Sequence, residues 1–70
     1  MDPDALTERE LEILACMAQG LPYKAIAVQL SITISTVQYH VTNILAKLHV
    51  GSRGAAVAVA RERRLLSQAP

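Results

Sequence analysis

Apolar residues recur along residues 34–48 at the spacing of one side of an α-helix. Placed at steps of four and three residues, this stripe consists of Val37, Val41, Ile44 and Leu48, widened by Leu45. The opposite side carries uncharged side chains, most of which can form hydrogen bonds. Its members are Ser35, Gln38, Tyr39, Thr42, Asn43 and Ala46. The pattern predicts a helix whose inward side is core and whose outward side could recognise a ligand.

Three further segments show helical spacing of apolar residues. We expect helices at about 8–19, 22–30 and 53–64, in addition to the one at 34–48, and we find almost no alternation typical of β-strands. The second and third helices are separated by only about three residues. Two helices joined so tightly form a helix-turn-helix, whose second helix enters the major groove in DNA-binding proteins. The sequence therefore predicts an all-α domain of four helices, with a structured core over about residues 6–66.

Residues suited to helix ends mark the expected boundaries. Thr7 and Glu10 have the spacing of a capping box, in which each side chain bonds the backbone N–H of the other residue. Gly20 can take the left-handed conformation that ends a helix, and Pro22 fits the first position of the next one. The N-caps of the third and fourth helices are expected to be Thr33 and Ser52.

The composition fits one small helical domain. The chain has 70 residues, of which 51% are hydrophobic, with no Trp or Phe and only three Gly. Its single cysteine, Cys16, excludes an intramolecular disulfide and is expected to be an inert packing residue within the first helix. We find no apolar run long enough to span a membrane, and the first residues are acidic, unlike a signal peptide. We therefore expect a cytoplasmic protein without a membrane partner.

The charges are distributed unevenly along the chain, although the net charge is only +1. Residues 1–20 contain five acidic residues and one arginine, a net charge of −4, whereas residues 21–70 contain six basic residues and one acidic residue, a net charge of +5. The folded domain could thus have an acidic side and a basic side, and a basic side suits a polyanion. From the charges alone, we favour the simpler interpretation that these six scattered cations form an ordinary solvated surface.

The fourth helix is apolar over most of its circumference, which is usual for a helix buried on more than one side. In so small a domain, a second copy of the chain could cover the outer side. The expected dimer interface comprises Ala55, Ala58, Val59 and Glu62. Because this surface is small, we expect a weak dimer that forms only on DNA. The alternative is that these alanines are simply good helix formers. Beyond this helix, Leu65 and Leu66 are expected to fold back onto the core.

Catalytic chemistry finds little support in the sequence. His40 stands beside the core stripe with no cysteine or carboxylate at ligand spacing, and only His49 accompanies it, nine residues on. We therefore expect His40 to be a structural, hydrogen-bonded histidine. No nucleophile and base are paired, and no glycine-rich phosphate loop is found. The sequence predicts neither an enzyme nor a cofactor or metal site.

An ordered set of motifs over about residues 6–60 resembles the LuxR-type helix-turn-helix domain of bacterial transcription regulators, also called the GerE or FixJ type. The resemblance is carried by residues 6–10 (LTERE), 20–27 (GLPYKAIA), Leu30, Ile32, Thr36, Val37, His40, Asn43, Ile44, 47–50 (KLHV), Arg53, Ala56, Val57 and Ala60. It implies four helices, DNA binding usually as a dimer, and a place as the C-terminal output domain of a longer response regulator, although single-domain members exist. The partners it suggests are double-stranded DNA, a second copy pairing through the fourth helix and, as a further candidate, RNA polymerase.

The resemblance also implies roles for individual residues. The base-contacting positions of the family fall on Gln38, Tyr39 and Thr42. Its phosphate-contacting positions fall on Lys24, Thr36, Asn43 and Lys47. These are largely the exposed residues that helical periodicity selects independently.

Three departures from the family pattern lie in the predicted second and third helices. A basic residue usual in the family is replaced by Gln38, an asparagine usual before Lys24 is replaced by Tyr23, and a residue often basic before Lys47 is replaced by Ala46. Fewer cations predict weaker non-specific DNA binding and a shallower salt dependence.

Gln38 can still pair bidentately with adenine, which is worth about 1–3 kcal/mol of discrimination. We expect a sequence-specific DNA-binding domain. The alternative is a protein-interaction module on the same fold, with weak or no DNA binding.

Overall fold

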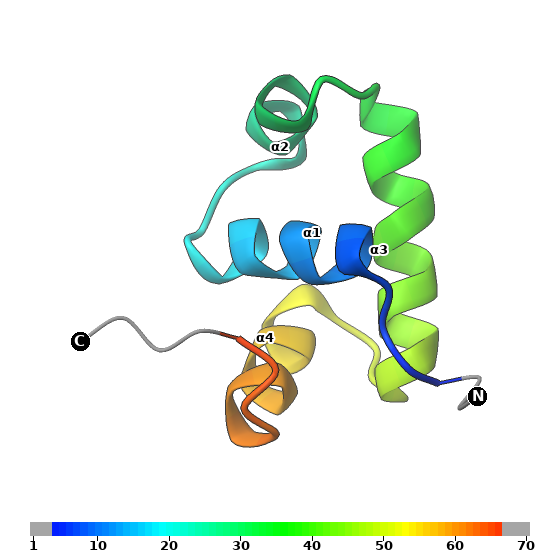
Figure 1. Ribbon diagram of the computed structural model, residues 1–70, viewed down its shortest axis with the longest axis vertical. Coiled ribbons are helices and arrows are strands. Elements are labelled where there is room, and N and C mark those ends of the chain that lie inside the picture. The colour runs from blue at the N-terminus through cyan, green and yellow to red at the C-terminus, as the bar shows by residue number, and fades with distance from the viewer. Residues whose placement is uncertain (1–3, 67–70) are drawn as a thin grey trace.

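The structure, a computed structural model, describes residues 4–66. Within that range the chain forms four helices and no strand, in the order α1 (Glu8–Ala18), α2 (Tyr23–Leu30), α3 (Ile34–Leu48) and α4 (Arg53–Glu62) (Figure 1). The predicted all-α domain of four helices is therefore confirmed. Residues 1–3 and 67–70 lie outside the described part of the chain.

Helix α3 is the longest element and runs along one side of the domain (Figure 1). It packs against each of the other three helices, and α1 additionally packs against α4. In Figure 1, α1 crosses the middle of the molecule, with α2 above it and α4 below it. This arrangement covers one side of α3 and leaves the other side uncovered.

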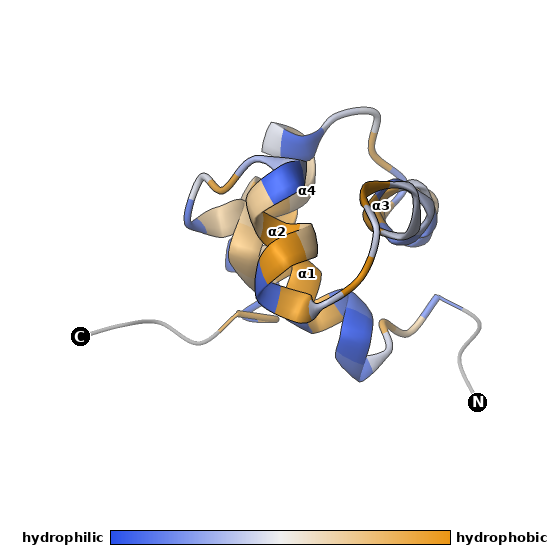
Figure 2. Cartoon of the chain, turned by 90° about the horizontal axis from the view of Figure 1, so that it is seen from above, coloured by the Kyte–Doolittle hydropathy of each residue, from blue (hydrophilic) through white to orange (hydrophobic). Residues whose placement is uncertain are grey.

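The core lies where the four helices meet. Figure 2 looks along α3 and shows apolar residues in orange on the neighbouring parts of α1 and α2. The largest side chains without solvent exposure are Ile13, Leu14, Ile26, Val37 and Ile44. The predicted inward stripe of α3 is fully confirmed, since Val37, Val41, Ile44 and Leu48 are all buried. Small residues complete the packing where helices approach closely, namely Ala27, Ala56 and Ala60.

The predicted N-caps are also confirmed. Thr7 and Glu10 form the capping box: the Thr7 Oγ1 accepts from the Glu10 N–H at 3.1 Å, and the Glu10 Oε1 accepts from the Thr7 N–H at 2.9 Å. The Thr33 Oγ1 accepts from the Thr36 N–H at 3.1 Å, and the Ser52 Oγ accepts from the Ala55 N–H at 3.2 Å. Each bond satisfies a backbone donor that the helix itself leaves unpaired.

All four helices end in the same hydrogen-bonding pattern. A residue with positive φ follows each helix, and an apolar residue comes next, whose N–H donates to a carbonyl five residues earlier. The positive-φ residues are Gly20, Ser31, His49 and Arg64. The bonds from the apolar residues are Leu21 to Cys16, Ile32 to Ala27, Val50 to Leu45 and Leu65 to Ala60, at 2.8–3.2 Å. Three of the four apolar residues then pack against the core, namely Leu21, Ile32 and Val50.

Three details of the predicted boundaries were wrong. Helix α1 ends at Ala18 rather than residue 19. Pro22 is the N-cap of α2, with extended ψ of 160°, rather than its first helical residue. Helix α4 ends at Glu62 rather than residue 64, because Arg64 takes a φ of 58°. Glycine usually occupies this conformation, and no glycine at this position indicated the turn. Of the two leucines beyond it, Leu66 packs against the core as expected, whereas Leu65 remains 37% exposed.

Candidate nucleic-acid interface

The outward side of α3 is an exposed surface without charge. Because the inward stripe is buried, helical periodicity turns the residues between its members toward solvent. The three predicted base-contacting residues lie together on this side: Gln38 and Thr42 are exposed, and Tyr39 is 65% exposed. Ser35 and Ala46 are also exposed and extend the same side toward the two ends of the helix.

Thr42 and Gln38 are joined through the helix backbone. The Thr42 Oγ1 donates to the Gln38 carbonyl at 3.0 Å, a bond between residues on successive turns. The bond fixes the Thr42 hydroxyl, while the Gln38 side chain makes no hydrogen bond within residues 4–66. The amide of Gln38 is therefore available to a partner outside the domain.

His40 lies beside this surface and is half-buried. Its ring meets the Tyr39 ring edge-on, with centroids 5.6 Å apart and planes at 65°. The hydrogen bond expected for His40 is not found within the described residues. The histidine thus supports the exposed tyrosine through a ring contact, in place of the predicted polar contact.

The predicted phosphate-contacting residues have different environments. Lys24 is exposed on α2 and forms no ion pair within residues 4–66. Thr36 and Asn43 are half-buried on α3. The Thr36 Oγ1 lies 2.9 Å from the Thr33 Oγ1, so this hydroxyl already takes part in the cap of α3. Lys24 is the member of the set whose charge is fully available.

Lys47 is held by a buried carboxylate. Its Nζ lies 2.7 Å from the Glu10 Oε1 and donates to the Ala5 carbonyl at 3.2 Å. The side chains of Lys47 and Glu10 are 23% and 5% exposed. Burial by itself would raise the pKa of Glu10, but hydrogen bonds from Lys47 and from the Thr7 backbone hold that pKa below its ordinary value. Of the three N–H groups of the ammonium, one remains for a phosphate.

This ion pair belongs to a wider contact between the start of the chain and the end of α3. The Ala5 carbonyl accepts from Lys47, and the Asp4 Oδ2 lies 3.2 Å from the His49 Nε2. Since Glu10 also completes the capping box of α1, one carboxylate links the first turn of α1 to the last turn of α3. The sequence indicated Glu10 only as a capping residue.

Arg53 provides a second long-range contact that sequence reasoning did not assign. Its guanidinium donates to the Leu21 carbonyl at 2.8 Å and lies over the Tyr23 ring, 4.6 Å from the centroid. The first residue of α4 is thereby fixed to the first residue of α2. Tyr23, one of the three departures from the family pattern, therefore packs against a cation within the domain.

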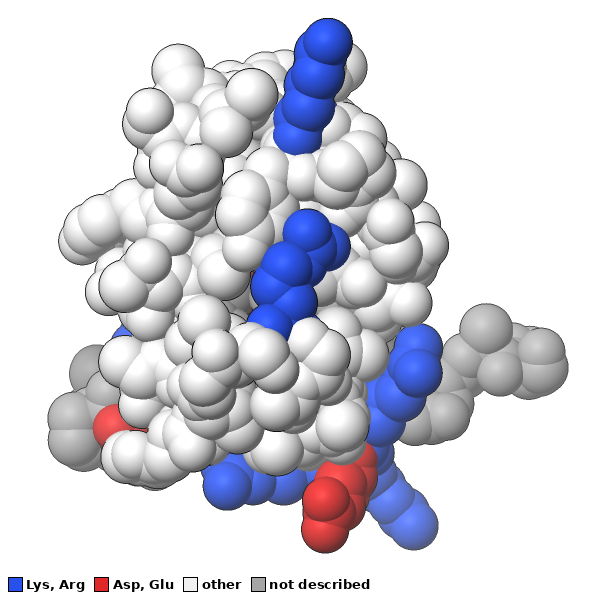
Figure 3. Space-filling view, turned by 180° about the vertical axis from the view of Figure 1, so that it is seen from behind, with Lys and Arg blue, Asp and Glu red and all other residues white. Residues whose placement is uncertain are grey.

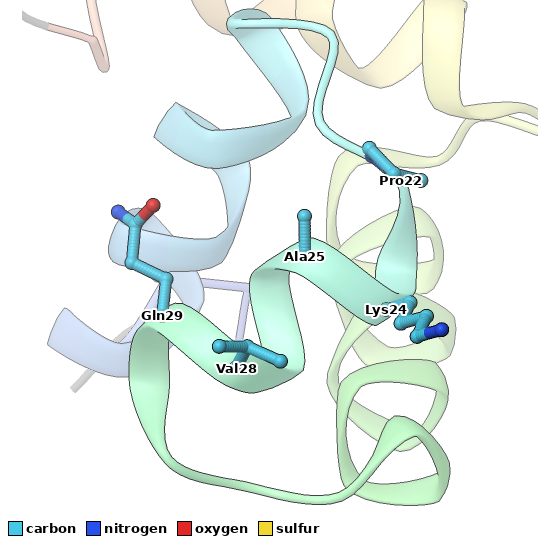
Figure 4. A pocket seen from close by; sticks show the side chains of 5 residues that line it. All are labelled: Pro22, Lys24, Ala25, Val28 and Gln29. Atoms are coloured by element: carbon cyan, nitrogen blue, oxygen red, sulfur yellow. The ribbon is translucent and has the colours of Figure 1, made fainter.

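Two exposed apolar residues were also missed. Val28 is 75% exposed on the outer side of α2, and Ile34 is 43% exposed in the first turn of α3. Figure 4 shows Val28 within a shallow groove lined by Pro22, Lys24, Ala25 and Gln29, with Lys24 and Gln29 pointing to opposite sides of the helix. Their signal in the sequence was weak, because an apolar residue off the main stripe is common on protein surfaces.

The basic charge gathers away from α3. Figure 3 shows the side opposite to Figure 1, where basic side chains stand apart over the upper part and gather near an acidic side chain at the lower edge. The last turn of α4, which lies low in Figure 1, and the two residues after it supply three exposed cations, namely Arg61, Arg63 and Arg64. The Arg61 guanidinium also donates to the Ala18 carbonyl at 3.3 Å. Lys47 belongs to the basic part of the chain and Glu10 to the acidic part. Because these two residues are paired, the domain is not clearly divided into an acidic side and a basic side.

The positions expected to form a dimer interface lie on the outer side of α4. Ala56 and Ala60 are buried against the rest of the domain, whereas Ala58 and Glu62 are exposed. Ala55 and Val59 are half-buried between these two sides. A second copy could therefore contact this side without disturbing the core.

Metal and thiol chemistry receive no geometric support in the described residues. Residues 4–66 contain no group of three or more His, Cys, Asp or Glu side chains that could hold a metal ion. Burial raises the pKa of the Cys16 thiol, and the nearby charge of Glu12 raises it further. The thiol is consequently a poor nucleophile, in line with the packing role predicted for it.

None of the helices in residues 4–66 has the length and apolarity that a membrane crossing requires.

The tight α2–α3 connection, the buried inward stripe of α3 and its exposed outward side define a helix-turn-helix domain of the DNA-binding class. The sequence matches the family described as bacterial regulatory proteins, luxR family, over residues 4–60, and the chain belongs to that family. The family resemblance inferred from the sequence is thus confirmed. The family consists of DNA-binding transcription regulators rather than enzymes, as predicted.

Two curated relatives illustrate the similarity. The transcriptional regulatory protein LiaR of Bacillus subtilis is 47% identical over 64 residues, which cover 91% of this chain and 30% of LiaR. The response regulator protein VraR of Staphylococcus aureus is 48% identical over 63 residues, which cover 90% of this chain and 30% of VraR. The chain therefore spans about 30% of the length of these relatives.

Solved structures show the same fold. The response regulator ChrA of a heme-sensing two-component system superimposes with a TM-score of 0.89 at 41% identity, over 94% of this chain and 33% of ChrA. The transcription factor GerE superimposes with a TM-score of 0.84 at 35% identity, over 89% of this chain and 92% of GerE. The second match confirms the four-helix arrangement for a protein of almost the same extent.

Proposed function

We propose that this chain is the sequence-specific DNA-binding output domain of a bacterial response regulator, with α3 in the major groove and two copies pairing through α4. The observation that carries the proposal is the two-sided character of α3: its inward stripe is completely buried, and its outward side presents Gln38, Tyr39 and Thr42 to solvent. Binding to chromosomal DNA would place the regulator in the cytoplasm.

The dimensions of α3 suit this role. Its 15 residues give a length of about 22 Å, and an α-helix with its side chains fits the major groove, which is about 12 Å wide. Lys24 on α2 and Lys47 at the end of α3 would then face the phosphates on either side of the groove, with Thr36 and Asn43 as uncharged partners. Lys24 has its full charge available and Lys47 is shared with Glu10, so the salt slope should lie between about −1 and −2 per copy.

The pairing of two copies follows from the outer side of α4. Ala58 and Glu62 are exposed there beside the half-buried Ala55 and Val59, so these side chains could contact a second α4. A two-fold dimer would place its recognition helices in half-sites about one turn of DNA apart. Since the contacting surface of one short helix is small, DNA would supply part of the energy that holds the dimer together.

A titration of labelled duplexes with the full chain at several salt concentrations tests DNA binding. We expect specific complexes at low salt, a shallow salt slope, and loss of specificity in Gln38→Ala and Tyr39→Ala. Gln19→Ala, an identical truncation of an exposed glutamine at the end of α1, is the matched control for Gln38→Ala and should leave specificity unchanged. If no sequence is bound above background at low salt, the proposal is wrong.

One observation supports a second candidate function. The outward side of α3 lacks cations, and Val28 is 75% exposed in the groove on α2, which suits a domain that binds another protein on this fold. RNA polymerase is one such partner for a regulator. Tight and specific DNA binding by the isolated domain, unaffected by Val28→Ser, would exclude this function as the principal one.

A further inference from the structure

We propose that the row formed by Ile34, Gln38 and Thr42 on α3 selects against guanine at the bases that it contacts and reads adenine through Gln38. The inference rests on the proposed function, because it assumes that α3 lies in the major groove. Arginine or lysine bonded to the O6 and N7 atoms of guanine is the commonest specific contact in that groove. The outward side of α3 offers no such cation, since its only charged residue, Lys47, directs its ammonium to Glu10 and Ala5.

Thr42 discriminates through the direction of its hydroxyl proton. A threonine hydroxyl has one proton to donate, and the Thr42 Oγ1 donates it to the Gln38 carbonyl at 3.0 Å. Toward a base the hydroxyl can therefore only accept. The major-groove edge of guanine carries acceptors alone, whereas adenine carries the N6 donor and cytosine the N4 donor. Thr42 thus disfavours guanine and accepts from adenine or cytosine, and its methyl group can contact the methyl of thymine.

Gln38 favours adenine at the base that it contacts. Its side-chain amide is exposed, makes no hydrogen bond within residues 4–66, and holds a donor and an acceptor side by side. This pair matches the N6 and N7 atoms of adenine. Because the Gln38 carbonyl is the acceptor for Thr42, the two side chains start from neighbouring turns of the same side of α3.

Ile34 extends this row by one more turn toward the start of α3. It is 43% exposed at the border between the inward stripe and the outward side, and stands four residues before Gln38 as Gln38 stands four residues before Thr42. A methyl-rich side chain there suits the C5-methyl of thymine. From Ile34 to Thr42 the helix rises about 12 Å, and at about 3.4 Å per base pair the row covers three to four base pairs. Within these base pairs, the expected half-site has adenine at the base that Gln38 contacts, adenine or cytosine at the base that Thr42 contacts, and thymine near Ile34.

Selection of bound sequences from random duplex DNA with the full chain tests this inference. We expect enriched half-sites with adenine at the position lost in Gln38→Ala and without guanine as the contacted base at the position lost in Thr42→Val. We also expect a loss of affinity of about 5- to 150-fold when the adenine opposite Gln38 is replaced by guanine. Gln38→Arg should change the preferred base at that position from adenine to guanine. Gln19→Arg adds the same charge outside α3 and should leave every base preference unchanged.

The outcomes separate this inference from the proposed function. Tight binding to enriched sites that carry guanine as the contacted base at the positions lost in Gln38→Ala and Thr42→Val would overturn the selection against guanine and leave DNA binding intact. Absence of any enriched sequence at low salt would overturn both. Retention of adenine by Gln38→Arg, with the fold verified by circular dichroism, would also overturn the assignment of Gln38.

Discussion

The ion pair between Lys47 and Glu10 makes a prediction that joins stability to DNA binding. Glu10→Gln keeps an oxygen that can accept from the Thr7 N–H, so the capping box can persist. It removes the charge that faces the Lys47 ammonium at 2.7 Å. The variant thus separates the electrostatic part of this contact from its role at the start of α1.

The expected loss of stability follows from burial. Breaking a fully buried ion pair costs about 3–5 kcal/mol, and losing one hydrogen bond to a charged group costs about 1.5–3 kcal/mol. Glu10 is buried, but the Lys47 side chain is 23% exposed and can regain part of its hydration. We therefore expect a decrease in the free energy of unfolding of about 1–3 kcal/mol, measured by urea denaturation. Glu12→Gln, which breaks the exposed pair with Arg9 in the same helix, should cost less than about 1 kcal/mol.

The decrease in the free energy of unfolding caused by Glu10→Gln should depend on pH. The pKa of Glu10 is lowered in the folded domain, so its carboxylate stabilises the fold at pH values above the ordinary pKa of 4.5. This contribution disappears as the pH falls from about 4.5 through the lower pKa of the folded state. The difference between wild type and Glu10→Gln should therefore be full at pH 7 and should shrink below about pH 4.5.

The same variant, Glu10→Gln, should lose stability but gain an electrostatic contact to DNA. An ammonium released from Glu10 becomes available to phosphate, so the salt slope should become steeper by up to about 1 per copy. Equal stability of Glu10→Gln and Glu12→Gln at pH 7 would refute the importance of the buried pair. An unchanged salt slope in a folded Glu10→Gln variant would show that Lys47 does not contact phosphate.

Three further predictions concern other parts of the domain. Ser31→Gly should stabilise the fold by about 0.5–1 kcal/mol in urea denaturation, because φ of 58° strains a serine and not a glycine; destabilisation would contradict this reason. Arg53→Lys should cost about 1 kcal/mol or more by the same assay, since lysine cannot both stack on Tyr23 and reach the Leu21 carbonyl, and Arg63→Lys on the exposed surface is its neutral control. Val59→Glu should abolish cooperative binding to paired half-sites, followed by analytical ultracentrifugation with DNA; unchanged cooperativity would argue against pairing through α4.

Periodicity predicted the parts of the fold that depend on neighbours in the chain. The stripe from Val37 to Leu48 and the caps at Thr7, Thr33 and Ser52 are set by spacings of three or four residues, and the structure confirms them. The end of α4 was missed because Arg64 adopts the left-handed conformation that glycine normally signals.

Periodic patterns could not predict contacts between residues that are far apart in the sequence. Lys47 and Glu10 are 37 residues apart, and Arg53 and Leu21 are 32 residues apart. Only the packing of the helices brings these pairs together, so the sequence could suggest a phosphate contact for Lys47 but not its pairing with an internal carboxylate. The exposure of Ile34 is likewise a result of packing, because its position borders the inward stripe.

The shared ending of the four helices has a consequence for how DNA binding could be controlled. Each turn is closed by backbone hydrogen bonds, and Leu21, Ile32 and Val50 anchor the turns in the core, so the directions of the helices are fixed relative to one another. The domain should move as a rigid body, with no hinge that would let α3 tilt on its own. A signal from elsewhere in a regulator would then act by bringing two copies together or by uncovering α3, and amide hydrogen exchange should be equally slow in the buried parts of α2 and α3 with and without DNA.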